Sequence, residues 1–185
     1  MHVRRVSTSV LATLIALGCT KHEYIPPKVQ ANPSQRDIYN VTLTLDDRFG
    51  SPVEINAISH YAVENTGLCT PNDKWAAIGG LHPGLYKEIP SSVRRLDQNT
   101  YAFRLVLDPF VDEDYFGLGV CNWKPMVVSM DISYEAWSIN ASFAPQRHVA
   151  PDHFLLFCNS SNMCGEGAPP ETSRAIQVRF EKAAS

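Results

Sequence analysis

The segment 108–116 gathers side chains that suit cation binding or contact with a basic partner. Four of the eight residues 108–115 are acidic, and aromatic residues lie among them. Carboxylates are the ligands that calcium prefers, but the known loop pattern of alternating acids, a glycine and a closing glutamate is absent. A solvated acidic loop and a contact surface are the other interpretations. We take Asp112, Glu113, Asp114, Tyr115 and Phe116 as the candidate partner-binding residues.

The histidines and serines show no arrangement typical of catalysis. His60, His82, His148 and His153 are scattered along the chain, and no Gly-x-Ser-x-Gly motif is present. His60 follows a serine in a strand-like segment, where an exposed or hydrogen-bonded side chain is the ordinary interpretation. Isolated serines such as Ser129 are expected to be structural. The sequence therefore predicts no enzyme, no catalytic residue, no metal site and no cofactor.

The first residues have the organisation of a secretion signal. Arg4 and Arg5 precede the apolar run 10–17, and small residues lead to Cys19. An apolar run of this length is too short to span a bilayer, whereas it suits a signal peptide. We therefore expect residues 1–18 to be removed on export.

Cys19 directly after Gly18 makes this segment resemble a bacterial lipoprotein signal. In that class the chain is cut before the cysteine, and the cysteine carries a thioether-linked diacylglycerol and a blocked amine. Several acyl chains give stable anchorage, where one gives only reversible binding. Thr20 is not acidic, which in this class implies delivery to the outer membrane. The resemblance implies lipidation at Cys19 on the periplasmic face; a plain secretory signal is the alternative.

The other four cysteines are an even set in an exported chain. They are Cys69, Cys121, Cys158 and Cys164. Two disulfides are typical of an oxidising compartment, and three pairings can be drawn. We favour Cys69 with Cys121 and Cys158 with Cys164, because the second pair closes a short turn. A zinc site is the rival, but the spacing lacks paired Cys-x-x-Cys motifs.

The charge balance disfavours nucleic acid as a partner. The 16 basic residues include Arg4 and Arg5 of the signal, so fourteen remain against 19 acidic residues. Binding to a phosphate backbone requires clustered Lys and Arg. We therefore expect no nucleic-acid partner, and we expect contact with the membrane only through the lipid anchor.

Beyond the signal, the chain divides into a tether and one domain. Residues 19–37 contain three prolines among polar residues and predict a disordered tether. Residues 38–185 fit a single domain. Period-two alternation and β-branched residues predict seven strands, at 38–45, 53–63, 101–107, 126–132, 137–143, 153–158 and 175–180. The predicted fold is all-β, a disulfide-stapled antiparallel β-sandwich of about seven strands.

One tract resembles a known group of envelope proteins. It comprises residues 114–123, with Gly117, Gly119, Cys121 and Trp123, together with residues 63–65 and Cys69 upstream. The tract is similar to small envelope lipoproteins encoded beside type VI secretion spike and lipase-effector genes, many regarded as immunity proteins. The likeness covers about residues 39–123 and rests on structural residues. It implies a periplasmic protein that binds and neutralises a secreted envelope toxin, a phospholipase.

A structural role is the main alternative function. An assembly lipoprotein of the cell envelope or of a secretion machine would have the same anchor, and the type VI outer-membrane lipoprotein is itself a small β-sandwich. The sequence pattern of that protein is not found in this chain, so this alternative ranks second. An enzyme ranks third, because a nucleophile or metal constellation is missing from the sequence.

Overall fold

The computed structural model describes residues 27–52, 54–71, 84–148, 152–166 and 174–184. The signal 1–18, Cys19 and residues 20–26 lie outside this part, so lipidation stays a prediction. No helix within the described ranges is long and apolar enough to cross a membrane.

Ten strands form one hydrogen-bonded sheet in the described part of the chain, in the order β3-β2-β6-β7-β9-β8-β10-β1-β5-β4. They are β1 (Ile38–Leu45), β2 (Glu54–Val63), β3 (Tyr86–Ser91), β4 (Arg94–Arg95), β5 (Thr100–Val106), β6 (Trp123–Ser133), β7 (Ser138–Phe143), β8 (His153–Cys158), β9 (Met163–Gly165) and β10 (Arg174–Lys182). Short helical turns are η1 (Asp47–Phe49), α1 (Thr66–Cys69) and η3 (Pro145–Arg147). All pairs are antiparallel except β7 with β9.

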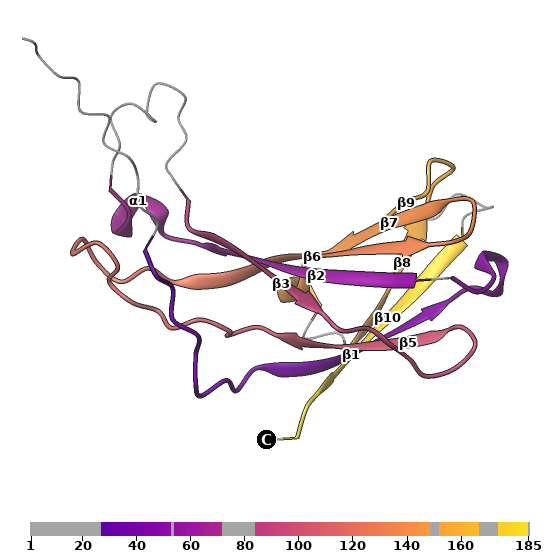
Figure 1. Ribbon diagram of the computed structural model, residues 1–185, viewed down its shortest axis with the longest axis horizontal. Helices are drawn as coiled ribbons and strands as arrows, with labels where there is room; N and C mark the ends of the chain where they lie inside the picture. The colour runs from indigo at the N-terminus through magenta and orange to yellow at the C-terminus, as the bar shows by residue number, and fades with distance from the viewer. Residues whose placement is uncertain (1–26, 53, 72–83, 149–151, 167–173, 185) are drawn as a thin grey trace, which may run out of the picture.

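The sheet curls, so that β2 and β6 face β1 and β5 across the core (Figure 1). Its two edge strands, β3 and β4, are consecutive in the chain and are joined by residues 92–93 alone. The all-β fold is confirmed, but one curled mixed sheet differs from the predicted seven-strand antiparallel sandwich. The seven predicted strands are present; β3, β4 and β9 were missed because they are short or largely exposed and lack the alternation.

Alternating side chains build the main core. In β1, Val41 and Leu43 are fully buried while Asn40 and Thr44 are exposed, as period two requires. The neighbouring strands β5 and β10 bury Phe103 and other apolar residues in the same cluster. Burial of this apolar surface is the main stabilising contribution to the fold.

A β-bulge in β6 changes which residues face inward. Tyr61 pairs with Pro125 and His60 pairs with Val127, so Met126 is the extra residue. The prediction that Met126 lies on the same face as Val128 is therefore wrong: Met126 is 52% exposed and Val128 is fully buried. The bulge keeps Pro125 directed toward the interior, level with Tyr61 of β2.

A second, smaller apolar cluster lies at one end of the sheet. Its buried members are Tyr61, Val63, Cys69, Leu85, Cys121 and Trp123. Val29, Ile89, Phe110, Tyr115 and Phe116 pack against it and are partly buried. This end cluster supports α1 and the acidic loop, and so positions the candidate site.

Candidate functional site

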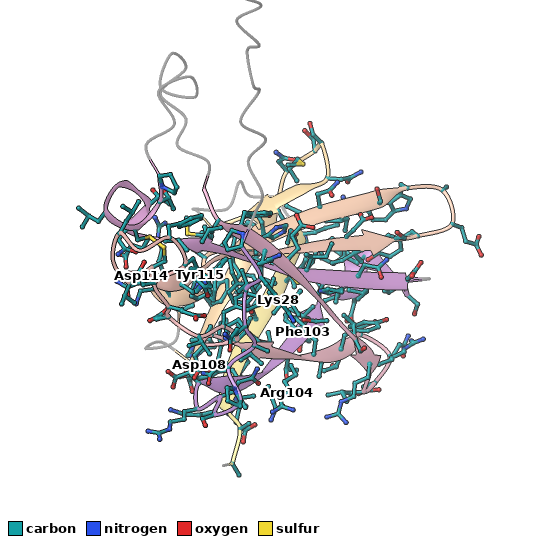
Figure 2. The ribbon with its side chains drawn as sticks, turned by 60° about the vertical axis from the view of Figure 1, so that its left-hand side comes forward. Lys28, Phe103, Arg104, Asp108, Asp114 and Tyr115 are labelled. Atoms are coloured by element: carbon teal, nitrogen blue, oxygen red, sulfur yellow. A yellow bond between two sulfur atoms is a disulfide. The ribbon has the colours of Figure 1, made fainter. Side chains whose placement is uncertain are left out.

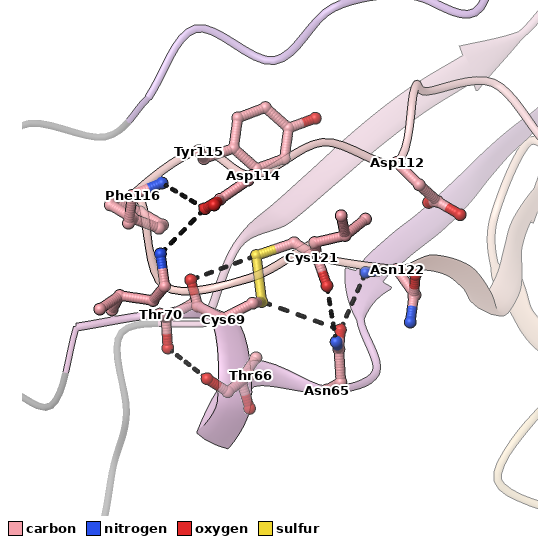
Figure 3. The surroundings of a disulfide bond; sticks show 12 residues. Asn65, Thr66, Cys69, Thr70, Asp112, Asp114, Tyr115, Phe116, Cys121 and Asn122 are labelled. Atoms are coloured by element: carbon pink, nitrogen blue, oxygen red, sulfur yellow. Dashed lines mark hydrogen bonds between the residues drawn. A yellow bond between two sulfur atoms is a disulfide. The ribbon is translucent and has the colours of Figure 1, made fainter.

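A disulfide-braced tip projects from this end of the sheet. We define the tip as residues 65–69 with residues 111–122. The Cys69–Cys121 bond joins its two parts across a Cα–Cα distance of 5.3 Å (Figure 3). The second bond, Cys158–Cys164, closes the turn between β8 and β9. The structure therefore contains the two pairings that the sequence favours.

Asn65 fastens the tip from the side of α1. Its Nδ2 donates to the Val120 carbonyl oxygen at 2.8 Å, and its Oδ1 accepts from the Asn122 N–H at 2.8 Å (Figure 3). Cys121 also donates its N–H to the Glu113 carbonyl oxygen at 3.0 Å. Because these bonds join distant parts of the chain, the tip is held in one conformation.

Asp114 organises the turn of the loop. Its Oδ1 accepts from the N–H groups of Leu118 at 3.0 Å and Phe116 at 3.3 Å. Backbone N–H groups, that of Gly119 first, lower the pKa of Asp114 because they stabilise its charged form. Gly117 (φ 71°) and Gly119 (φ 136°) adopt the conformations that this tight turn needs and that other residues rarely reach.

Tyr115 points inward and bonds at its hydroxyl. The hydroxyl donates to the Val111 carbonyl oxygen at 2.8 Å and accepts from Trp123 Nε1 at 3.1 Å. Burial raises the pKa of Tyr115, since the phenolate would lose hydration. Figure 2 shows Asp114 and Tyr115 adjacent on this loop. Tyr115 therefore fixes the loop to the end cluster.

The other predicted contact residues lie in the same loop. Asp112 is exposed, and its Oδ1 accepts from the Trp123 N–H at 2.8 Å. Glu113 and Phe116 are half-buried, and Phe116 packs against the end cluster. All five candidates therefore come together in one loop, but Asp112, Asp114 and Tyr115 also shape that loop.

Three exposed apolar residues of the tip were missed by the sequence reasoning. Leu68 is 77% exposed, Leu118 is 55% exposed and Val120 is 52% exposed. Leu118 and Val120 alternate with Gly117 and Gly119, a pattern that could have marked an apolar turn. Within the described part of the tip, these apolar side chains are open to contact with another surface.

The segment 27–37 is docked on the domain, which corrects the predicted tether. Ala31 forms a bridge with Phe110, and the Asn32 N–H donates to the Pro109 carbonyl oxygen at 2.8 Å. The Asp108 carboxylate accepts from the N–H groups of Arg36 at 2.9 Å and Asp37 at 3.2 Å. The predicted free tether therefore extends too far along the chain. Asp108 accepts hydrogen bonds from Arg36 and Asp37, and the sequence of the tether alone does not reveal these contacts.

A groove of about 570 Å³ runs beside the tip. Asp37, Asp108 and Asp112 line it together with the rings of Phe110 and Trp123. The two rings lie 4.9 Å apart between centroids. Lys124 also lines the groove, so three carboxylates face one ammonium group, and the remaining negative charge suits a basic side chain.

His60 and Ser129 form a second polar cluster, on the outer face of the sheet. His60 Nε2 lies 2.6 Å from Ser129 Oγ, and His60 Nδ1 contacts the Tyr86 hydroxyl and lies 3.4 Å from Glu88 Oε1. This order of groups resembles a nucleophile, base and acid. However, Ser129 lies within β6, whose backbone pairs with β2 and β7 on either side. The ladders use the N–H groups that an oxyanion hole would need.

Neither a metal site nor similarity to a known protein identifies the function. Within the described ranges, no group of three or more His, Cys, Asp or Glu side chains is placed to hold a metal ion. Comparisons with protein-family models, curated proteins and solved structures found no match. The function is therefore argued from the site itself.

Proposed function

We propose that this protein is an immunity lipoprotein of the periplasmic face of the outer membrane. It binds and neutralises a secreted envelope toxin, a phospholipase delivered by type VI secretion. The observation that carries the proposal is the braced tip, with Asp112, Glu113 and Asp114 on a loop fixed by the Cys69–Cys121 bond. The signal ending at Cys19 supplies the proposed anchor.

A fixed loop suits neutralisation by occupancy. Asn65 and Asp114 already hold the backbone of the loop, so little conformational entropy is lost when a partner binds. The exposed carboxylates of Asp112 and Asp114 attract a basic entrance of an active site over a distance. The adjacent groove then accepts a basic side chain of the toxin between Asp108 and Trp123.

The curled sheet serves as the scaffold of this binding module. Its two halves face each other across the core, and the end cluster around Trp123 packs against the loop. Such a module needs no catalytic group of its own, because covering the active site is sufficient to stop the toxin.

The second candidate is a structural lipoprotein of the envelope or of a secretion machine. Tyr86 of β3 and Met126 of β6 favour it, since both are at least half exposed on the two strands that flank β2. Permanent assembly partners cover apolar residues of this kind.

Co-expression in the periplasm with a phospholipase effector of type VI secretion tests the proposal. We expect survival with this protein, killing without it, and a complex by pull-down that depends on the acidic loop. Equal killing in both cultures with no complex would reject neutralisation and favour the structural role. Glu54→Gln is the matched control, because Glu54 is exposed on β2 outside the tip.

A further inference from the structure

We propose that the apolar apex of the tip rests on the lipid bilayer to which the protein is anchored. The apex consists of Leu68, Leu118 and Val120, and we infer that these side chains enter the boundary between headgroups and acyl chains. The inference rests on the proposed anchor at Cys19 and adds an orientation: the domain stands with the apex, and not the acidic residues 112–114 of the tip, on the membrane.

The three apex residues come from two chain segments that lie close together. Leu68 belongs to α1, which the Cys69–Cys121 bond ties to the loop that carries Leu118 and Val120. A Cβ atom placed on Gly119 would lie 3.6 Å from the Leu68 carbonyl oxygen, so the two chain segments are in close approach. Each of the three side chains is more than half exposed. Clustered exposed apolar residues on a braced tip mark an interaction surface.

The segment between Cys19 and the domain is short, and its length determines that the apex faces the membrane. Pro27, the first described residue, follows Cys19 by eight residues, which reach at most about 29 Å when fully extended. Val29 packs against the end cluster beneath the tip. The described chain also begins on the side of α1 (Figure 1). An anchored Cys19 therefore holds this end close to the bilayer.

The backbone of the apex suits contact with lipid. The Val120 carbonyl oxygen accepts from Asn65, and the Leu118 N–H donates to Asp114. Polar backbone groups that are bonded internally lose little when water is removed, whereas unpaired groups would resist insertion.

The carboxylates beside the apex determine which lipid surface charge the apex tolerates. Asp112 and Asp114 are exposed beside the apex, so an anionic surface would repel it. A zwitterionic surface carries no such cost. We therefore expect contact with phosphatidylethanolamine and phosphatidylcholine, weakened as anionic lipid is added.

Fluorescence quenching by brominated lipids tests the contact. The full lipidated protein is reconstituted in vesicles of phosphatidylethanolamine and phosphatidylcholine with brominated acyl chains. Leu118→Trp and Val120→Trp report on the apex. Leu96→Trp is the control, because Leu96 is 50% exposed in the turn between β4 and β5. That turn bonds to η1 through Asn99, and Figure 1 shows η1 at the end opposite α1.

We expect the tryptophan introduced at position 118 or 120 to be quenched about twofold more than the tryptophan introduced at position 96. Brominated acyl chains quench only fluorophores that lie within the bilayer. Anionic lipid should reduce the difference. Equal quenching at Leu118, Val120 and Leu96 overturns the inference. Palmitate labelling of the parent protein tests the anchor separately. If the protein is labelled but the apex tryptophans are not quenched, only the orientation is rejected. If the protein is not labelled, the anchor is rejected.

Discussion

The indole N–H of Trp123 donates to the hydroxyl of Tyr115 at 3.1 Å, at the start of β6. The same hydroxyl donates to the Val111 carbonyl oxygen, so it joins both ends of the acidic loop. Trp123 also packs its ring against Phe110. This connection explains how an exposed, charged loop keeps one conformation.

Removal of the Tyr115 hydroxyl should destabilise the protein. In Tyr115→Phe, the Val111 carbonyl oxygen and the indole N–H of Trp123 lose their partner, and we expect a loss of about 1–2 kcal/mol in the free energy of unfolding. Urea unfolding measures it. Tyr134→Phe is the matched control, because the buried Tyr134 hydroxyl has no hydrogen-bond partner within the described residues. That variant should be neutral or slightly stabilising; equal losses would contradict the assignment.

The strands could be predicted because the alternation of apolar and polar residues in the sequence matches the alternation of buried and exposed side chains in a strand. Residues 38–45 alternate, and the structure buries Tyr39, Val41, Leu43 and Leu45. Met126 was misplaced because a bulge shifts the register there, and the local signal for that bulge, Pro125 within a central strand, was not used. The docking of residues 27–37 depends on Asp108, 71 positions from Asp37 in the chain, and no local pattern records such a contact.

The roles within the loop could not be read from composition. The sequence shows Asp114 as one acid among several, yet its oxygens accept backbone N–H groups of the following turn. Tyr115 was expected as an anchor for a partner, and its hydroxyl instead bonds within the protein. Such roles depend on the path of the backbone, which the disulfide and the glycines determine together.

Loss of the long-range disulfide should cost more stability than loss of the short one. Cys69 and Cys121 are separated by 52 positions, and Cys158 and Cys164 by 6. Loop entropy in the unfolded chain then gives about 4 kcal/mol for the first bond and about 2 kcal/mol for the second. Urea unfolding of the two double Cys→Ser variants tests the order. A larger loss without Cys158–Cys164 would contradict the entropic argument.

The tip loop should open in acid. The pKa of Asp114 is lowered in the folded protein, so its contribution to stability is present above the unfolded pKa of about 3.9 and is lost as pH falls through the folded value. Hydrogen exchange at the Phe116 and Leu118 amides should therefore lose protection below about pH 3.9, beyond the intrinsic pH dependence of exchange. Asp114→Asn retains an acceptor oxygen and should remove this pH dependence. A profile unchanged by that substitution would contradict the role of the carboxylate.

Lipidation at Cys19 should hold the protein on membranes. Metabolic labelling with palmitate should label the parent chain, while Cys19→Ser should be unlabelled and released from the membrane fraction. The domain should stay folded, since the two disulfides pair the other four cysteines and do not use Cys19. Thr20→Ser is the control and should remain labelled and membrane-bound. A parent chain without label would reject the anchor.

Charge on the acidic loop should govern the rate of association with the toxin. Asp112→Asn, Glu113→Gln and Asp114→Asn, combined, remove three charges but keep acceptor oxygens for Trp123 and Leu118. We expect association to slow by about tenfold at low salt and to become less dependent on salt, with little change in dissociation. Tyr115→Ala should instead speed dissociation, because it removes the support of the loop. Surface plasmon resonance with the lipase separates the two rates. The combined variant binding as fast as the parent, with the same salt dependence, would place the contact elsewhere.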